Sequence, residues 1–125
     1  QGNKEERAMI EQVQSFLAAH GESRFSDRAR CVLDENHSPK TLVRVGFREG
    51  GGIDPVQYYV YPTSFRDEVC KGHDYRSIAK LLVDRGYMKP GEGRNLAPKI
   101  RGLPGHSDPV RMYHITHKIW EYEND

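Results

Sequence analysis

Apolar positions at the start of the chain recur with the period of a helix. Met9, Val13, Phe16 and Leu17 stand at i, i+4, i+7 and i+8, which places them on one face of a helix. Gly21 follows them, and glycine readily takes the left-handed conformation that ends a helix. The pattern predicts an amphipathic helix over residues 3–20.

Between residues 42 and 61 the pattern changes to short extended segments. Residues 42–48 (LVRVGFR) and 56–61 (VQYYVY) are rich in β-branched and aromatic residues, and a glycine run and Asp54-Pro55 separate them. We therefore predict a β-hairpin over residues 42–61. Residues 22–41 show no hydrophobic period around Cys31-Val32-Leu33, and we expect irregular structure there.

Two helical patterns separated by a tight turn occupy residues 63–86. Thr63 or Ser64 can cap the first helix, and Gly72 supplies the positive φ that ends it. Asp74 is a good N-cap for the second helix, which Gly86 ends. Helical spacing places one set of residues on a buried stripe: Tyr75, Ile78, Ala79 and Leu82. It leaves another set on the opposite, polar face: Arg76, Ser77, Lys80 and Asp84.

Two further extended segments, residues 87–88 and 110–114, can pair across a loop rich in glycine and proline. A loop of that length in a compact domain usually has a function. After these segments, residues 118–122 can form a helical turn or extend an edge strand, with Ile119 and Trp120 packing on the core.

The order of these elements predicts an α+β fold, a winged helix-turn-helix with an additional β-hairpin before the helix-turn-helix pair. The helix-turn-helix and wing occupy residues 63–116. With 125 residues, of which 36% are hydrophobic, the chain can bury one core, so we expect a single domain over residues 1–125. Residues 1–2 resemble a tag remnant, and the chain is expected to be a C-terminal fragment of a larger protein.

Charge is distributed unevenly along the chain. The formal net charge is +1, but residues 63–101 carry nine Lys and Arg against five Asp and Glu. This excess favours contact with a polyanion. No run of 18 apolar residues and no signal-peptide core is present, so we expect a soluble cytoplasmic protein that does not contact a membrane.

The second helix and the wing carry the candidate DNA-binding residues. In a helix-turn-helix, the polar face of the second helix reaches base edges and phosphates in the major groove. We expect Arg76, Ser77 and Lys80 to act there, whereas wing cations would follow the phosphates. The alternative is a solvated face with i, i+4 charge pairs. The complete candidate set is Lys71, His73, Arg76, Ser77, Lys80, Lys89, Arg94, Lys99 and Arg101.

The sequence gives little support for a catalytic, cofactor or metal site. Cys70 and His73 stand near each other, but no orienting acid or oxyanion hole accompanies them, and we expect Cys70 in the core. His114 and His117 lack a third metal ligand. Residues 91–94 (GEGR) are not followed by the Lys-Ser/Thr of a phosphate-binding loop. We expect reduced thiols, no cofactor, no metal and no catalytic residue.

Three tyrosines in the hairpin leave a choice open. Tyr58, Tyr59 and Tyr61 can stack single-stranded bases, or they can pack against the first helix, which we favour. A rival function is a winged helix that docks on protein. Its mark would be an apolar patch that includes Val83, Tyr59 and Tyr61.

Several phrases of the chain resemble one group of proteins. They are residues 16–25 (FLAAHGESRF), 44–48 (RVGFR), 58–62 (YYVYP), 65–70 (FRDEVC) and 81–90 (LLVDRGYMKP). Together they are similar to the C-terminal region of large helicase/primase-like proteins of phages, plasmids and integrative elements, whose central domain of unknown function is often described as an inactivated superfamily II helicase. The resemblance covers most of residues 8–115, although residues 27–41 have no counterpart in it.

The resemblance implies a non-catalytic module that follows an ATPase core and helps the parent protein engage DNA during replication of a mobile element. Its expected partners are DNA, either duplex or single-stranded, and the ATPase core of the parent.

Overall fold

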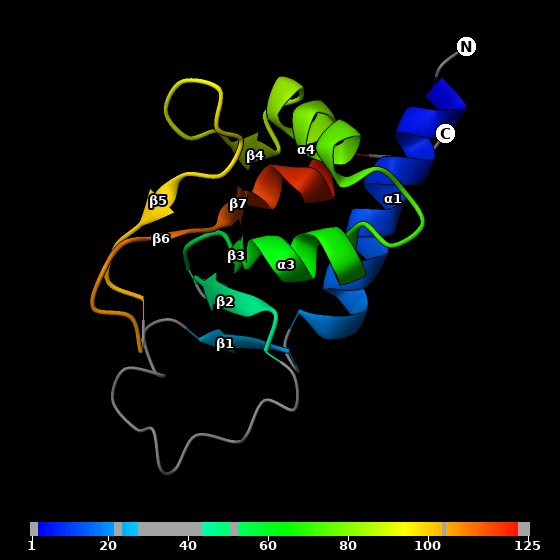
Figure 1. The fold of residues 1–125 in the computed structure, drawn as a ribbon. Coiled ribbons are helices and arrows are strands. Elements are labelled where there is room, and N and C mark those ends of the chain that lie inside the picture. Colours follow the sequence, from blue (N-terminus) through cyan, green and yellow to red (C-terminus); the bar gives the residue numbers. More distant parts are fainter. Residues whose placement is uncertain (1–2, 22–23, 28–43, 51–52, 104, 123–125) are drawn as a thin grey trace.

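The computed structural model describes residues 3–21, 24–27, 44–50, 53–103 and 105–122. Figure 1 shows the order of the elements along the chain. They are α1 (Asn3–His20), β1 (Phe25–Asp27), β2 (Gly46–Glu49), β3 (Gln57–Val60), α3 (Pro62–Ser64), the π-helical turn η1 (Phe65–Val69), α4 (Tyr75–Asp84), β4 (Met88–Lys89), β5 (Lys99–Ile100), β6 (Val110–Arg111), β7 (Tyr113–Ile115) and the 3-10 helix η2 (His117–Glu121).

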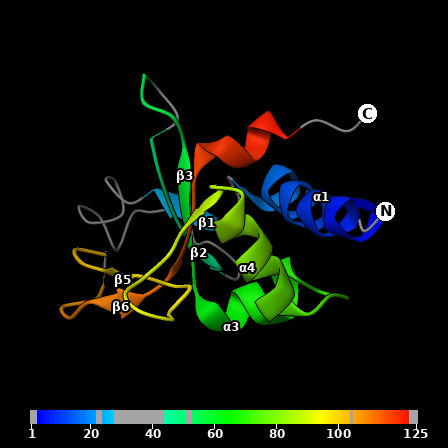
Figure 2. The same cartoon turned by 90° about the horizontal axis from the view of Figure 1, so that it is seen from above.

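Five strands form one sheet in the order β1-β2-β3-β7-β4, and β5 and β6 form a separate two-stranded sheet. β1 pairs in parallel with β2, whereas the other neighbours are antiparallel. Figure 2 shows the helices on one side of the main sheet and the β5–β6 hairpin on the other. The predicted α+β class is therefore confirmed.

The main core lies between the helices and the sheet. The apolar stripe of α1 enters it through Ile10, Val13 and Leu17, and α4 contributes Ile78 and Leu82. The observed bounds of α1, Asn3–His20, confirm the helix that the periodicity predicts. This packing leaves the opposite side of α4 outward.

The start of α4 agrees with its sequence signal. The Asp74 carboxylate accepts hydrogen bonds from the Ser77 backbone N–H at 3.3 Å and from the Ser77 hydroxyl at 2.7 Å. Gly72 and Gly86 flank the helix with φ of 88° and 81°, as the turns require. Asp74 is thus the N-cap, and within the predicted stripe only Tyr75 is half-buried rather than buried.

Removing this cap is expected to destabilise the fold. The pKa of Asp74 is lowered, mainly by the hydrogen bond from the Ser77 hydroxyl. A carboxylate with a lowered folded-state pKa stabilises the fold above its unfolded-state value of about 3.9, and this contribution is lost as the pH falls through the folded-state pKa. Asp74→Ala should therefore lower the melting temperature by a few degrees at pH 7 and by less below about pH 4. Equal melting temperatures at pH 7 would contradict the capping role, and Asp74→Asn, which keeps an acceptor, is the matched control.

The first helix of the pair departs from the prediction at its start. Tyr61 is the N-cap residue and makes no side-chain capping bond, and Pro62 occupies the first turn, where its missing N–H costs nothing. The prediction that Thr63 or Ser64 caps this helix is therefore wrong. The helix then widens into η1, in which the Cys70 N–H donates to the Phe65 carbonyl at 2.9 Å.

Residues 25–27 are a strand, which corrects the prediction of irregular structure for that part of residues 22–41. β1 pairs with β2 in the register Phe25↔Gly46, and the Phe25 ring packs edge-on against Tyr58 at 5.2 Å between centroids. A strand of three residues is too short to show a period of its own. The segment 28–43 lies outside the described residues, and within the predicted hairpin β2 and β3 pair as expected.

A second core lies on the other face of the sheet. Alternation along β3 sends Tyr58 and Val60 to the helices and Tyr59 to this face. The second core consists of Phe47, Tyr59, Leu103 and Met112, with Tyr61, Ile100 and Val110 packed against it. The segment 90–109, which the sequence suggested was a long loop, therefore contains a strand and buried residues of its own.

The end of the described chain closes the main sheet. β4 pairs with β7 through Met88↔Ile115 and Lys89↔His114, which confirms pairing between the segments that follow Gly86 and precede Thr116. In η2, Ile119 is buried as expected. Trp120 is 40% exposed, so the prediction that it packs on the core is wrong.

Candidate nucleic-acid interface

The polar face of α4 is exposed to solvent as predicted. Arg76, Ser77, Lys80 and Asp84 are all exposed, whereas Ile78, Ala79 and Leu82 on the other side are buried. The helix thus presents two cations outward from a firmly packed base.

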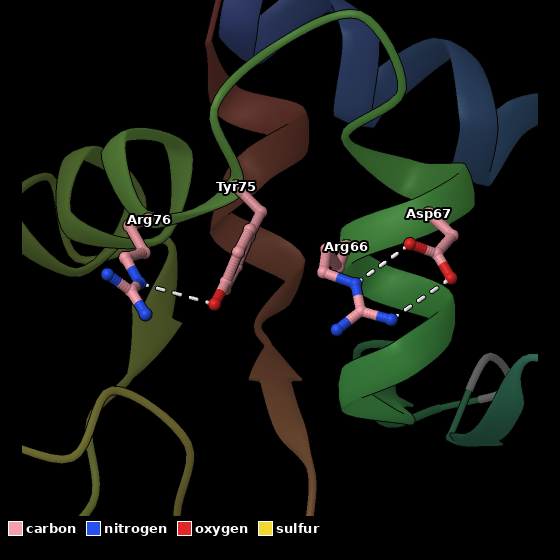
Figure 3. Close-up of polar contacts among 4 residues, drawn as sticks. All are labelled: Arg66, Asp67, Tyr75 and Arg76. Atoms are coloured by element: carbon pink, nitrogen blue, oxygen red, sulfur yellow. Dashed lines mark hydrogen bonds and ion pairs between the residues drawn. The ribbon is translucent and has the colours of Figure 1, made fainter.

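Arg76 is held by the residue before it. Its Nε donates to the Tyr75 hydroxyl at 3.2 Å, and its Cζ lies 5.6 Å from the centre of the Tyr75 ring (Figure 3). The pKa of Arg76 is raised, first by this hydrogen bond. The guanidinium therefore stays charged, and its remaining N–H groups are available for a ligand.

Arg66 is a cation of the same region that the sequence reasoning missed. It lies on η1 and contacts the Asp67 carboxylate through Nε at 2.8 Å and Nη2 at 3.3 Å. This bond raises the pKa of Arg66 and lowers that of Asp67. Figure 3 shows Arg66 and Arg76 on either side of Tyr75. Because the neighbouring acid offsets its charge, sequence alone offers no signal for Arg66.

Ser77 has a structural role that competes with its predicted one. Its only hydroxyl proton is directed at the Asp74 carboxylate, so the donor that a phosphate oxygen would need is already used. Asp74 also brings a negative charge to the start of α4. We therefore retain Arg76 and Lys80, but not Ser77, as ligand contacts of this face.

The flanking candidates lie at both ends of α4. Lys71, in the turn before the helix, and Lys89, in β4, are exposed. Within the described part of the chain, Lys71, Lys80 and Lys89 have no carboxylate partner. His73 is half-buried, and its backbone N–H donates to the Cys70 carbonyl at 2.9 Å. The three lysines are thus the more accessible contacts.

The cations of the predicted wing, Arg94, Lys99 and Arg101, are exposed. Ala97 and Leu103, which flank the two later cations, are buried. The β5–β6 hairpin, which carries Lys99, therefore packs on the second core through Ile100 and Val110, whereas Arg94 precedes it in the chain.

The tyrosines of β3 pack rather than face solvent. Tyr58 and Tyr59 are buried, and the Tyr59 hydroxyl donates to the Glu49 carboxylate at 2.8 Å. The Tyr61 hydroxyl and His106 Nε2 are 2.9 Å apart. Tyr58 packs in the main core with residues of α1, which confirms the packing interpretation for Tyr58. Tyr59 is buried in the second core on the other face of the sheet, so the prediction that it packs against the first helix is wrong. Its burial also removes Tyr59 from the apolar patch that protein docking would need.

Cys70 and His114, which the sequence offered as possible reactive or metal-binding residues, are buried and packed inside the fold. Cys70 is buried in the main core, as predicted, and burial raises the pKa of its thiol. His114 is buried, hydrogen-bonds Gln57 and lies 4.5 Å from the Tyr59 ring between centroids. Among the residues that the structure describes, no group of three His, Cys, Asp or Glu is arranged to hold a metal ion. Cys31 lies outside the described residues.

Comparison of the chain with protein-family models, with curated proteins and with solved structures returns no match. Within the described residues, every helix is too short or too polar to cross a lipid bilayer. The case for a function therefore depends on the geometry of the chain itself.

Proposed function

We propose that this chain is a winged helix with an additional β-hairpin and that it binds DNA through α4 and the segment after β4. Three helices pack on one face of the sheet, and α4 follows a tight turn. The strand before the helix pair, β3, lies beside β7, and β7 lies beside β4. In a winged helix, the second strand of the wing lies between the first strand of the wing and the strand that precedes the helix pair. Here β7 lies between β4 and β3, which supports the proposal.

The observation that carries the DNA proposal is the exposed cationic side of α4. Arg76 and Lys80 are one helical turn apart and point away from the main core. A helix held in this way fits the major groove, where an arginine can donate two hydrogen bonds to guanine and a lysine can reach a phosphate.

The other candidates extend the contact. Lys71 and Lys89 would hold the phosphate backbone on either side of α4, His73 would lie in the turn, and the wing cations Arg94, Lys99 and Arg101 would continue along the strand. In this proposal the chain is a non-catalytic accessory module of a mobile-element replication helicase or primase. It works in the cytoplasm next to the ATPase core of the parent protein.

Titration of the protein with labelled duplex and single-stranded DNA of one sequence, at 50 and 200 mM salt, tests the proposal. With one phosphate contact for each of Lys71, Lys80, Lys89, Arg94, Lys99 and Arg101, a fourfold rise in salt should weaken binding to duplex DNA by about 2,000-fold. The DNA form, duplex or single-stranded, that binds with the higher affinity is the target. Absent or salt-insensitive binding would contradict the proposal and favour docking on protein.

The exposure of Trp120 favours protein docking as a second candidate function. It is the only tryptophan of the chain, is 40% exposed and lies on η2, which contacts α1. Large aromatic residues often anchor protein interfaces. A shift of the tryptophan emission when the parent ATPase core is added, with no change on adding DNA, would support this alternative.

A further inference from the structure

Two cations face each other directly in the β5–β6 hairpin. Lys99 and Arg111 are register partners of this antiparallel ladder. Side chains of directly opposed residues stand on the same face with Cβ atoms about 5 Å apart, and like charges in this position destabilise a strand pair. The hairpin therefore keeps an unfavourable pair in a position where one opposite charge would stabilise it.

The fold prevents the two side chains from separating across the ladder. The neighbouring pair, Ile100 and Val110, packs against the second core, so alternation turns Lys99 and Arg111 to the other face of the hairpin. The Met112 N–H donates to the Pro98 carbonyl at 3.0 Å and extends the ladder beyond the cationic pair. The register is thus fixed by apolar packing on one side and by hydrogen bonding along the strands.

No described acid neutralises the pair. Arg111 Nη1 donates to the Ala97 carbonyl at 2.8 Å, which fixes the guanidinium without offsetting its charge. Among the described residues, neither Lys99 nor Arg111 has a carboxylate partner. The segment 88–111 carries five Lys and Arg against two Asp and Glu, so the local field remains positive.

We propose that Lys99 and Arg111 together bind one backbone phosphate of the nucleic acid. The site rests on the proposed function and adds Arg111 to the candidate set. A phosphate between the two side chains would replace their repulsion by two charge-assisted hydrogen bonds, with the guanidinium already positioned. Because no base edge is required, the contact would strengthen binding without selecting a sequence.

The test compares Lys99→Gln/Arg111→Gln with Lys4→Gln/Lys118→Gln, which removes two exposed charges from α1 and η2. Loss of one phosphate contact should lower the log–log salt slope of DNA binding by about one unit and the affinity by about fivefold at 0.15 M salt. Lys99→Gln alone, which removes no hydrogen bond among the described residues, should give a partial effect in the same direction. A hairpin variant that binds DNA with the wild-type slope and affinity would overturn the proposal.

Thermal melting with and without sodium tripolyphosphate separates this site from the proposed function. A ligand that binds only the folded state raises the melting temperature, so wild type should gain stability and Lys99→Gln/Arg111→Gln should gain less. If wild type is stabilised in this way but does not bind DNA, the anion site stands and the DNA function fails. If tripolyphosphate affects both proteins equally, the site is wrong even where DNA binding is retained.

Discussion

Replacing Arg76 and Lys80 together by glutamate is expected to weaken DNA binding by about 50-fold or more at 0.15 M salt. Each lost phosphate contact lowers affinity by about fivefold at this salt concentration, and each reversed charge adds repulsion. Both side chains are exposed on α4, so the change removes charge without opening the core. The salt slope should fall by about two units if both residues contact phosphates.

The comparison needs a control with the same change in net charge. Lys4→Glu/Lys118→Glu reverses two exposed lysines on α1 and η2 that lie outside the candidate set. Fluorescence anisotropy measures binding, and circular dichroism checks that both variants fold. If the two variants lose affinity equally, only the net charge matters and α4 is not the interface.

Sequence predicts those parts of the fold that depend on local signals. The bounds of α1 follow from one apolar stripe, and the start of α4 follows from Asp74 and the glycines beside the helix. In both places the residues that decide the conformation lie within a few positions of the element that they shape. The antiparallel pairing of β2 with β3 belongs to the same class, because a short loop joins the two strands.

Elements that form only by pairing with distant segments cannot be predicted from local sequence signals. β1 exists because β2 pairs with it across the intervening segment 28–45. The β5–β6 hairpin packs through Ile100 and Val110 against residues of β2 and β3, which no local period in its glycine-rich segment reveals. Such contacts form only when folding brings remote segments together. The local residue propensities and the spacing of apolar residues therefore do not predict them.

The residues of the candidate site also fall into those that local sequence signals predict and those that require the structure. The exposure of Arg76 and Lys80 follows from helical spacing, since the buried stripe of α4 fixes the opposite face. The role of Arg111 requires the register with Lys99, which sequence does not specify. Ser77 is an intermediate case, because the cap signal at Asp74 predicts a hydrogen bond from the Ser77 backbone N–H, whereas the bond that uses its hydroxyl is found only in the structure.

Phe65→Ala is expected to cause the largest loss of stability, about 3–5 kcal/mol. Phe65 is fully buried where η1 begins, and its ring stacks on Tyr113 of β7 with centroids 4.1 Å apart and 20° between the planes. Deleting the ring leaves a cavity between the helix pair and the central strands, and the sheet on one side limits how far the site can collapse. For a domain of ordinary stability, about 5–15 kcal/mol, such a loss removes a large part of the total.

Urea unfolding followed by circular dichroism measures the effect, with Phe65→Leu as the matched control. Leucine keeps most of the apolar volume but cannot stack on Tyr113, so it should cost clearly less than alanine. If alanine costs less than about 1 kcal/mol, Phe65 does not join the helix pair to the sheet. The position of α4 would then depend on its own buried residues, Ile78, Ala79 and Leu82, without support from Phe65.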